Sequence, residues 1–134
     1  MKRTLPILLA IMVIFTACVK SPPSATETIK KHYTTILKAN DTATLRNELT
    51  ELEKLTTDTN LNEDELLFAK YTYNVAYGVT KLSLSGKDIS FFDFPEMDLL
   101  NAAVAGIANG EMEISDDLVS ESVNFLQKVE TFIK

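Results

Sequence analysis

The chain has 134 residues, with 13 basic and 19 acidic side chains, one His, one Cys and no Trp. This length suits a single domain, and one cysteine excludes an internal disulfide framework. A formal net charge of −6 excludes a general nucleic-acid binder, because neutralising phosphates requires clustered Lys and Arg. A single imidazole also excludes the common zinc enzymes whose sites need two histidines.

The first residues differ in kind from the rest of the chain. Met1-Lys2-Arg3 is a short basic start, and the run from Leu5 to Phe15 is uncharged and apolar apart from Pro6. As a helix, that run spans about 16 Å, roughly half of the ~30 Å hydrocarbon core of a bilayer. The segment is therefore typical of a secretory signal peptide, not of a transmembrane helix.

The only cysteine follows this segment directly. Phe15-Thr16-Ala17-Cys18 resembles the lipobox of bacterial lipoproteins, in which the cysteine is acylated and becomes the new N-terminus. Phe15 departs from the aliphatic residue usual at that place. The resemblance covers residues 1–18 and implies a lipid anchor on Cys18 in the bacterial cell envelope. Because Val19 is not Asp, it implies the outer membrane, facing the periplasm, in a diderm organism. Ordinary secretion and a buried cysteine are the alternatives.

The predicted cleavage divides the chain into three parts. Residues 1–17 are the signal peptide, 18–23 the lipidated N-terminus with a short tether, and 24–134 a single helical domain. Without the two basic residues of the leader, eleven basic residues remain against nineteen acidic ones, a net charge of −8. Pro22-Pro23 favours an extended tether, which reaches at most about 20 Å. We expect the domain to stay close to the bilayer.

Two amphipathic helices are predicted at the start of the domain. Ser24 and Glu27 have the spacing of a capping box. The residues that follow form an apolar stripe of helical period: Ile29, Tyr33, Ile36 and Leu37. The segment Asn40-Asp41-Thr42 breaks and recaps the chain. A second stripe then begins: Leu45, Leu49, Leu52 and Leu55.

A third helix is predicted between two clear signals. Asn62-Glu63-Asp64-Glu65 provides a start with acidic residues where the helix N-terminus favours them. Ser85-Gly86 provides a C-cap. Between them apolar and aromatic residues occur nearly all round, which is typical of a central helix with several neighbours.

Two more helices complete the domain. Asp93-Phe94-Pro95-Glu96 is predicted to open the fourth, with proline tolerated in the first turn, and Asn109-Gly110 to close it. Ser115 is predicted to cap the fifth. Their apolar stripes are Met97, Leu100, Ala103, Val104 and Ile107, then Leu118, Ser122, Phe125, Leu126, Val129 and Ile133.

These elements predict an all-α fold. No stretch of five or more residues alternates strictly with β-branched side chains, so strands are not needed. Short connections favour antiparallel neighbours and hence an up-down bundle of four or five helices. A short solenoid of helical hairpins is the alternative.

Large apolar residues crowd the predicted loop from Asp88 to Phe94. One interpretation is that the phenylalanines fold back and seal one end of the bundle. The other is an exposed aromatic anchor for a partner protein, which Tyr71 and Tyr77 extend if the third helix is partly uncovered. The candidate interface residues are Phe91, Phe92, Asp93, Phe94, Tyr71 and Tyr77.

We predict no catalytic residue, no metal ligand and no cofactor. His32 falls beside the first apolar stripe, where a boundary histidine needs no catalytic partner. The carboxylates around Glu111 and Glu113 lack the frame of a calcium loop.

The predicted function is therefore non-enzymatic. The chain is expected to be a lipid-anchored envelope protein that binds the membrane through Cys18 and a second envelope protein through its domain, as an accessory, exclusion or immunity factor. The alternative is a periplasmic carrier that binds a small ligand inside the bundle, which the tyrosine-rich third helix favours.

Overall fold

The computed structural model describes residues 24–90 and 92–134. The predicted leader, Cys18, the tether and Phe91 lie outside the described residues. Within the described part, all regular secondary structure is helical, which confirms the all-α prediction. The helices are α1 (Ala25–Lys38), α2 (Thr42–Leu55), α3 (Glu63–Ser85), α4 (Met97–Ala108) and α5 (Asp116–Ile133).

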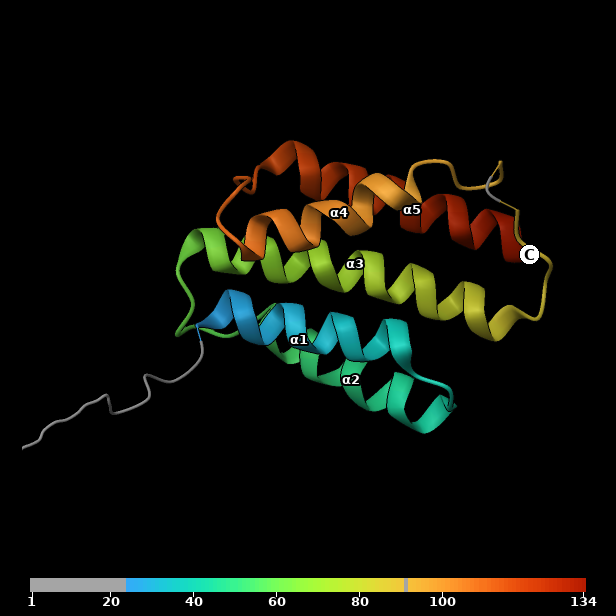
Figure 1. Ribbon diagram of the computed structural model, residues 1–134, viewed down its shortest axis with the longest axis horizontal. Helices are drawn as coiled ribbons and strands as arrows, with labels where there is room; N and C mark the ends of the chain where they lie inside the picture. The colour runs from blue at the N-terminus through green and yellow to red at the C-terminus, as the bar shows by residue number, and fades with distance from the viewer. Residues whose placement is uncertain (1–23, 91) are drawn as a thin grey trace, which may run out of the picture.

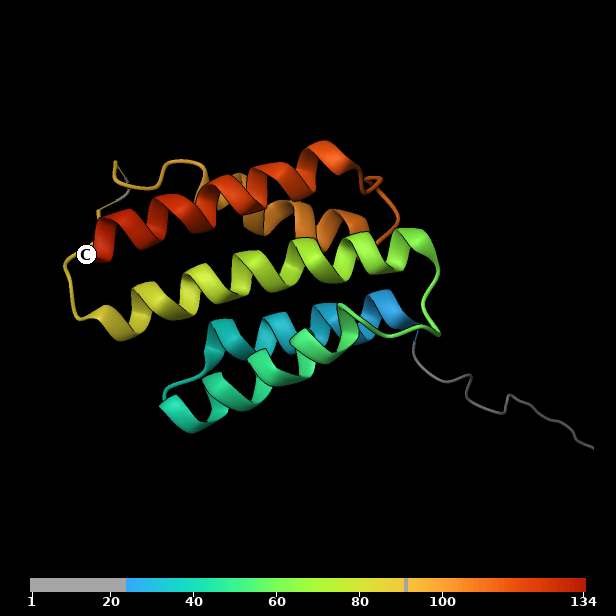
Figure 2. The same ribbon diagram turned by 180° about the vertical axis from the view of Figure 1, so that it is seen from behind.

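The helices form an up-down bundle around α3. Consecutive helices run in opposite directions along one long axis (Figure 1). In the two opposite views, α1 and α2 lie on one side of α3, and α4 and α5 on the other (Figures 1 and 2). Because α3 contacts each of the other four helices, the arrangement is a bundle with one central helix, not a row of stacked hairpins.

The helix starts are set by local polar side chains. Ser24 accepts a hydrogen bond from the Glu27 backbone N–H at 3.2 Å. Asn62 and Glu65 form a complete capping box, in which each side chain accepts from the other residue's backbone N–H, at 2.8 and 2.9 Å. Such caps satisfy donors that the first helical turn leaves without a partner. Gly86 ends α3 in the left-handed region at φ 71°.

The fourth helix begins later than its sequence predicts. It starts at Met97, and residues 93–96 form turns. Asp93, the first residue of the predicted start, instead accepts a hydrogen bond from the backbone N–H of Ser90 at 2.9 Å. Its carboxylate therefore closes a turn in the preceding loop, and the N-cap position falls to Glu96, whose side chain forms no cap.

The core lies along α3. Its largest fully buried side chains come from α3, α1, α2, α4 and α5 together: Tyr71, Phe68, Phe125, Ile29, Leu52, Val75, Val104 and Val129. α5 approaches α3 closely at Gly78, where an added Cβ would lie 2.5 Å from Phe125 Cε2. Glycine is needed there because any side chain would overlap the phenyl ring.

The bundle has two distinct ends. The starts of α1 and α3 meet the α4–α5 turn, since Thr26, Asn62 and Met112 line one shallow pocket. The α3–α4 loop lies at the opposite end (Figure 1). The two ends are separated by α3, whose 23 residues rise about 34 Å. No helix of the described residues is both long and apolar enough to cross a bilayer.

Candidate protein-binding surface at the α3–α4 loop

The segment between α3 and α4, residues 86–96, is called the aromatic loop here. Its middle is closed by a short turn in which the Asp93 backbone N–H donates to the Ser90 carbonyl at 3.0 Å. The Asp93 carboxylate also accepts from the Ser90 backbone N–H at 2.9 Å and from its hydroxyl at 3.3 Å. These three bonds hold Ser90 and Asp93 together in the middle of the loop.

Phe94 anchors the aromatic loop to the bundle. Its side chain is 3% exposed and packs edge-on against Phe125 and Phe132 of α5, with ring centroids 5.8 and 5.3 Å apart. Lys128 Nζ lies 5.1 Å above the Phe94 ring. The expectation that Phe94 is part of an exposed contact surface was therefore wrong, because this side chain seals the end of the bundle.

Phe92 has the opposite environment. Two residues before the buried Phe94, its side chain is 87% exposed, the highest value among the large hydrophobic residues described. Ile89, just before this turn, is also exposed. Burial of one phenylalanine thus fixes the loop while the turn at Ser90 and Asp93 presents another to solvent.

Tyr71 is not on this surface. It is fully buried, and its hydroxyl donates a hydrogen bond to the Leu100 carbonyl of α4 at 2.9 Å. Burial raises the pKa of Tyr71, and the nearby Glu121 carboxylate raises it further. The suggestion that Tyr71 extends an interface was wrong, because the residue joins α3 to α4 in the core.

Tyr77 lies beside α2, away from the aromatic loop. It packs edge-on against Tyr73 with ring centroids 5.7 Å apart, and Lys81 Nζ lies 5.2 Å above its ring. Together with side chains of α2, the two tyrosines line an open groove of about 400 Å³, here called the α2–α3 groove: Arg46, Leu49, Thr50, Glu53, Tyr73 and Tyr77.

A second groove adjoins the aromatic loop. It lies between α4 and α5, has a volume of about 290 Å³, and is called the α4–α5 groove: Glu96, Leu99, Leu100, Glu121, Asn124, Phe125 and Lys128. Sequence reasoning missed it. The signal that could have revealed it is Leu99, which falls outside the apolar stripe of α4 and is 77% exposed.

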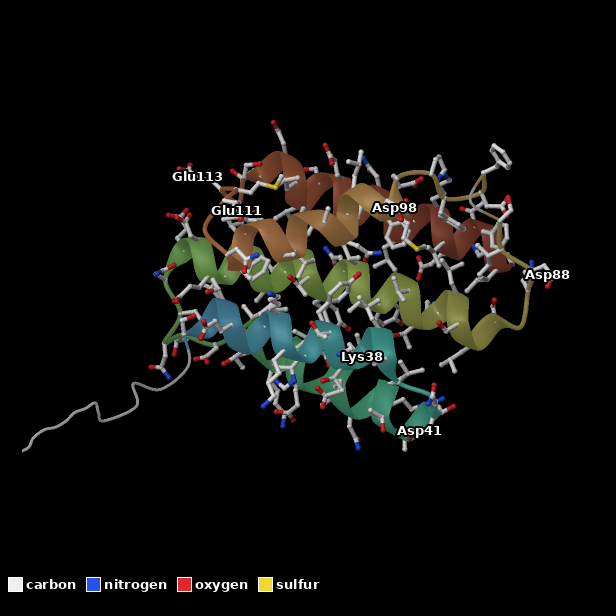
Figure 3. The ribbon with its side chains drawn as sticks, in the orientation of Figure 1. Lys38, Asp41, Asp88, Asp98, Glu111 and Glu113 are labelled. Carbon is white, nitrogen blue, oxygen red and sulfur yellow. The ribbon has the colours of Figure 1, made fainter. Side chains whose placement is uncertain are left out.

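Charged side chains of both signs surround the aromatic loop and the α4–α5 groove, including Lys87 and Lys128. Asp88 and Asp98 lie on the aromatic loop and the first turn of α4 (Figure 3). Ile89, Phe94 and Asp98 border a further hollow of about 220 Å³ beneath the loop. Apolar side chains at this end of the bundle are therefore bordered by both carboxylates and lysines.

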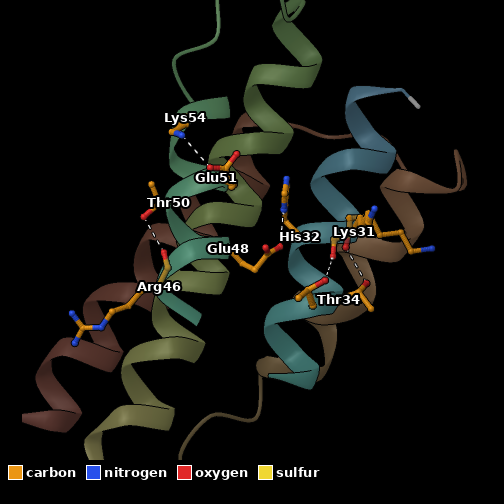
Figure 4. Close-up of polar contacts among 10 residues, drawn as sticks. Lys31, His32, Thr34, Arg46, Glu48, Thr50, Glu51 and Lys54 are labelled. Carbon is orange, nitrogen blue, oxygen red and sulfur yellow. Dashed lines mark hydrogen bonds and ion pairs between the residues drawn. The ribbon is translucent and has the colours of Figure 1, made fainter. Parts of the chain in front are cut away.

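His32 has a structural environment. Its Nδ1 lies 2.7 Å from Glu48 Oε1, so that the pair joins α1 to α2 (Figure 4). Both side chains are mostly buried between the two helices. The arrangement provides no nucleophile and is explained by packing of the first two helices.

The carboxylates show no arrangement suited to a metal. Among residues 24–90 and 92–134, no group of three or more His, Cys, Asp or Glu could hold a metal ion. Glu111 and Glu113 lie on the α4–α5 turn, at the other end of the bundle from Asp88 (Figure 3). Comparison with known protein families, with curated proteins and with solved structures finds no match.

Proposed function

We propose that the chain is a lipid-anchored protein of the bacterial envelope that acts by binding another envelope protein. The observation that carries this proposal is the contrast within the aromatic loop. Phe94 is 3% exposed and Phe92 is 87% exposed, although both belong to the same short apolar run. An exposed aromatic side chain on a loop that is anchored to the core is typical of a protein-binding surface.

The position of the loop suits an anchored binder. The described part of the chain begins at Ser24, just before α1, and the aromatic loop lies at the opposite end of the bundle (Figure 1). The tether spans at most about 20 Å and α3 is about 34 Å long. The distance from the lipid to the loop is therefore a few tens of ångströms at most. The anchor raises the effective concentration of the loop near a partner in the same membrane.

The lipid anchor is tested with Cys18→Ser. One acyl chain gives only marginal membrane binding, whereas two or more anchor stably, so removing the thiol should remove all stable binding. We expect the variant to lose incorporation of labelled fatty acid and to extract from membranes without detergent. Unchanged membrane retention of the variant would contradict the anchor.

The binding surface is tested by photo-cross-linking in the native host. A photoreactive amino acid at position 92 should give a discrete cross-linked species that contains a second protein. The matched control is the same substitution at Met112, which is 42% exposed and lies at the other end of the bundle. Equal cross-linking from both positions, or none from position 92, would count against a surface at the aromatic loop.

A carrier of small molecules is the second candidate function. The α2–α3 groove favours it, because two tyrosine rings, the Arg46 guanidinium and the Glu53 carboxylate border one hollow. Such a groove suits a small ligand with an apolar body and a charged group. Native mass spectrometry of the purified protein distinguishes the two functions, since a carrier should retain a small molecule that Tyr77→Ala releases.

A further inference from the structure

The α4–α5 groove arises from the way the last two helices pack. α5 contacts chiefly α3, whereas α4 rests on α1 and α3. The contacts of α5 on this side come from the aromatic loop just before α4, where Phe94 packs against Phe125 and Glu96 pairs with Lys128. The groove lies between α4 and α5 themselves.

The floor of the groove is apolar and rigid. Leu100 and Phe125 are 4% and 2% exposed, and both pack in the core. The Leu100 carbonyl is held by the Tyr71 hydroxyl at 2.9 Å. Leu99 forms one wall and remains 77% exposed. A partner that covered this groove would bury Leu99 without requiring Leu100 or Phe125 to move.

The rim of the groove carries two carboxylates and one ammonium group, on Glu96, Glu121 and Lys128. Lys128 Nζ donates to both carboxylate oxygens of Glu96, at 3.1 and 3.2 Å, and thereby closes the end next to the aromatic loop. Glu121, on the α5 wall, forms no ion pair with any residue of the described part of the chain. Asp117 lies one turn before it on the same face of α5. The negative charge at the open part of the groove therefore comes from Glu121, with Asp117 next to it on α5.

We propose that the α4–α5 groove binds an amphipathic helix of the partner protein, with an apolar stripe and basic flanks. This inference rests on the proposed protein-binding function and specifies the chemistry of the partner. A helix lying across the groove inserts large side chains from positions i and i+3 or i+4 beside Leu99, over the floor of Leu100 and Phe125. Lys or Arg at its flanks pair with Glu121 and Asp117.

The dimensions of the groove agree with this ligand. A volume of about 290 Å³ is at the lower end of small-molecule pockets and suits about two inserted side chains, not a whole helix. A second copy of this chain is the poorer occupant, because the Glu121 and Asp117 carboxylates of the two copies would face each other and like charges across an interface repel.

The inference is tested with the bundle alone. Every helix, cap and core residue described lies within residues 24–134, so a chain that begins at Val19 keeps the whole bundle. The probe is a fluorescent 18-residue peptide of Leu and Lys, with Leu at the spacing of one helix face. Fluorescence anisotropy should show saturable binding at least ten-fold tighter than binding of a peptide of the same pattern with Glu for Lys.

Matched variants assign the binding to the groove. Leu99→Ser and Glu121→Gln should each weaken binding of the Leu/Lys peptide at least five-fold. Leu37→Ser, which changes an exposed leucine on α1, should leave it unchanged, and circular dichroism should show the same helicity for all three. Equal weakening by Leu37→Ser and Leu99→Ser would overturn the proposal. So would equal binding of a scrambled Leu/Lys peptide that has no apolar face.

Failure of this proposal is distinguishable from failure of the proposed function. The peptide experiment needs neither the lipid nor the native partner. Without groove-dependent binding of the peptide, a cross-link from position 92 would still support a partner that recognises the aromatic loop alone. Groove-dependent binding without a cross-link would leave the helix-binding groove in place and remove the role of Phe92.

Discussion

The two sides of α5 differ in how completely they are packed. Towards α3, the helix is fitted so closely that Gly78 must lack a side chain, because a Cβ would lie 2.5 Å from the ring of Phe125. Towards α4, the same helix borders an open groove in which Leu99 is 77% exposed. The α3–α5 interface is tightly packed, whereas the α4–α5 interface is partly open. The groove is therefore a local feature and not the result of a generally loose core.

The same contrast recurs within the aromatic loop. Phe94 is enclosed by Phe125 and Phe132 of α5, whereas Phe92 is exposed on the turn closed by Asp93. In both places a residue that fixes the structure lies next to one that is exposed. The variants below test whether the buried residues determine stability and the exposed residues do not.

The largest effect is expected for Phe125→Ala. Phe125 is buried against Gly78 on one side and Phe94 on the other, so truncation removes packing from both regions. The free energy of unfolding should fall by about 3–5 kcal/mol, as for other buried phenylalanines. Urea titration measures it. Leu99→Ala is the control on the open side and should change stability by about 0.5 kcal/mol or less.

A smaller effect is expected for Gly78→Ala. Alanine favours a helix over glycine by about 1 kcal/mol, but the new methyl group collides with Phe125. Overpacking of this kind costs about 1–3 kcal/mol, so a net loss of stability is predicted. Gly106→Ala is the control, since its Cβ would meet Met112 at 3.3 Å, on a turn that can shift. A gain in stability from Gly78→Ala would contradict the tight α3–α5 contact.

Tyr71→Phe should cost about 1 kcal/mol at neutral pH, since it removes one buried hydrogen bond to the Leu100 carbonyl. It should also change the alkaline limb of stability. Burial raises the pKa of Tyr71 above its ordinary value of 10.0, so the folded state holds its proton more tightly than the unfolded state. The contribution of this pKa difference to the free energy of unfolding is therefore fully present below pH 10 and is lost as the pH rises above it.

The variant should lose less stability than the parent between neutral pH and pH 11. Unfolding in urea at both pH values measures this difference. Tyr33 is a second buried tyrosine whose pKa is raised by burial, so part of the alkaline loss should persist in Tyr71→Phe. An identical alkaline loss in parent and variant would show that Tyr71 ionises as freely in the folded state as in the unfolded state.

Much of the fold follows from local signals in the sequence. The caps at Ser24, Asn62 and Ser115 and the left-handed Gly86 have the positions that hydrogen-bond geometry requires, and they bound the predicted helices. α4 is the exception. Asp93 can cap a helix or close a turn with equal chemistry, and only the burial of Phe94 against α5 decides between the two.

The candidate site was predictable only in outline. An apolar run in a loop indicates either a seal or a contact surface, and the structure contains a seal at Phe94 and an exposed ring at Phe92. Which phenylalanine has which role depends on the direction that the loop takes over α5, and helical periodicity contains no information about this. Tyr71 was misplaced for a related reason, since an all-round apolar helix does not reveal which side its neighbours cover.

The most direct test of the central claim is the stability of Phe92→Ser. If Phe92 is a surface residue available to a partner, the free energy of unfolding of the variant should lie within about 0.5 kcal/mol of the parent, with unchanged helicity. A loss of about 2 kcal/mol or more in urea titration would contradict the account, because it would mean that Phe92 seals the bundle as Phe94 does.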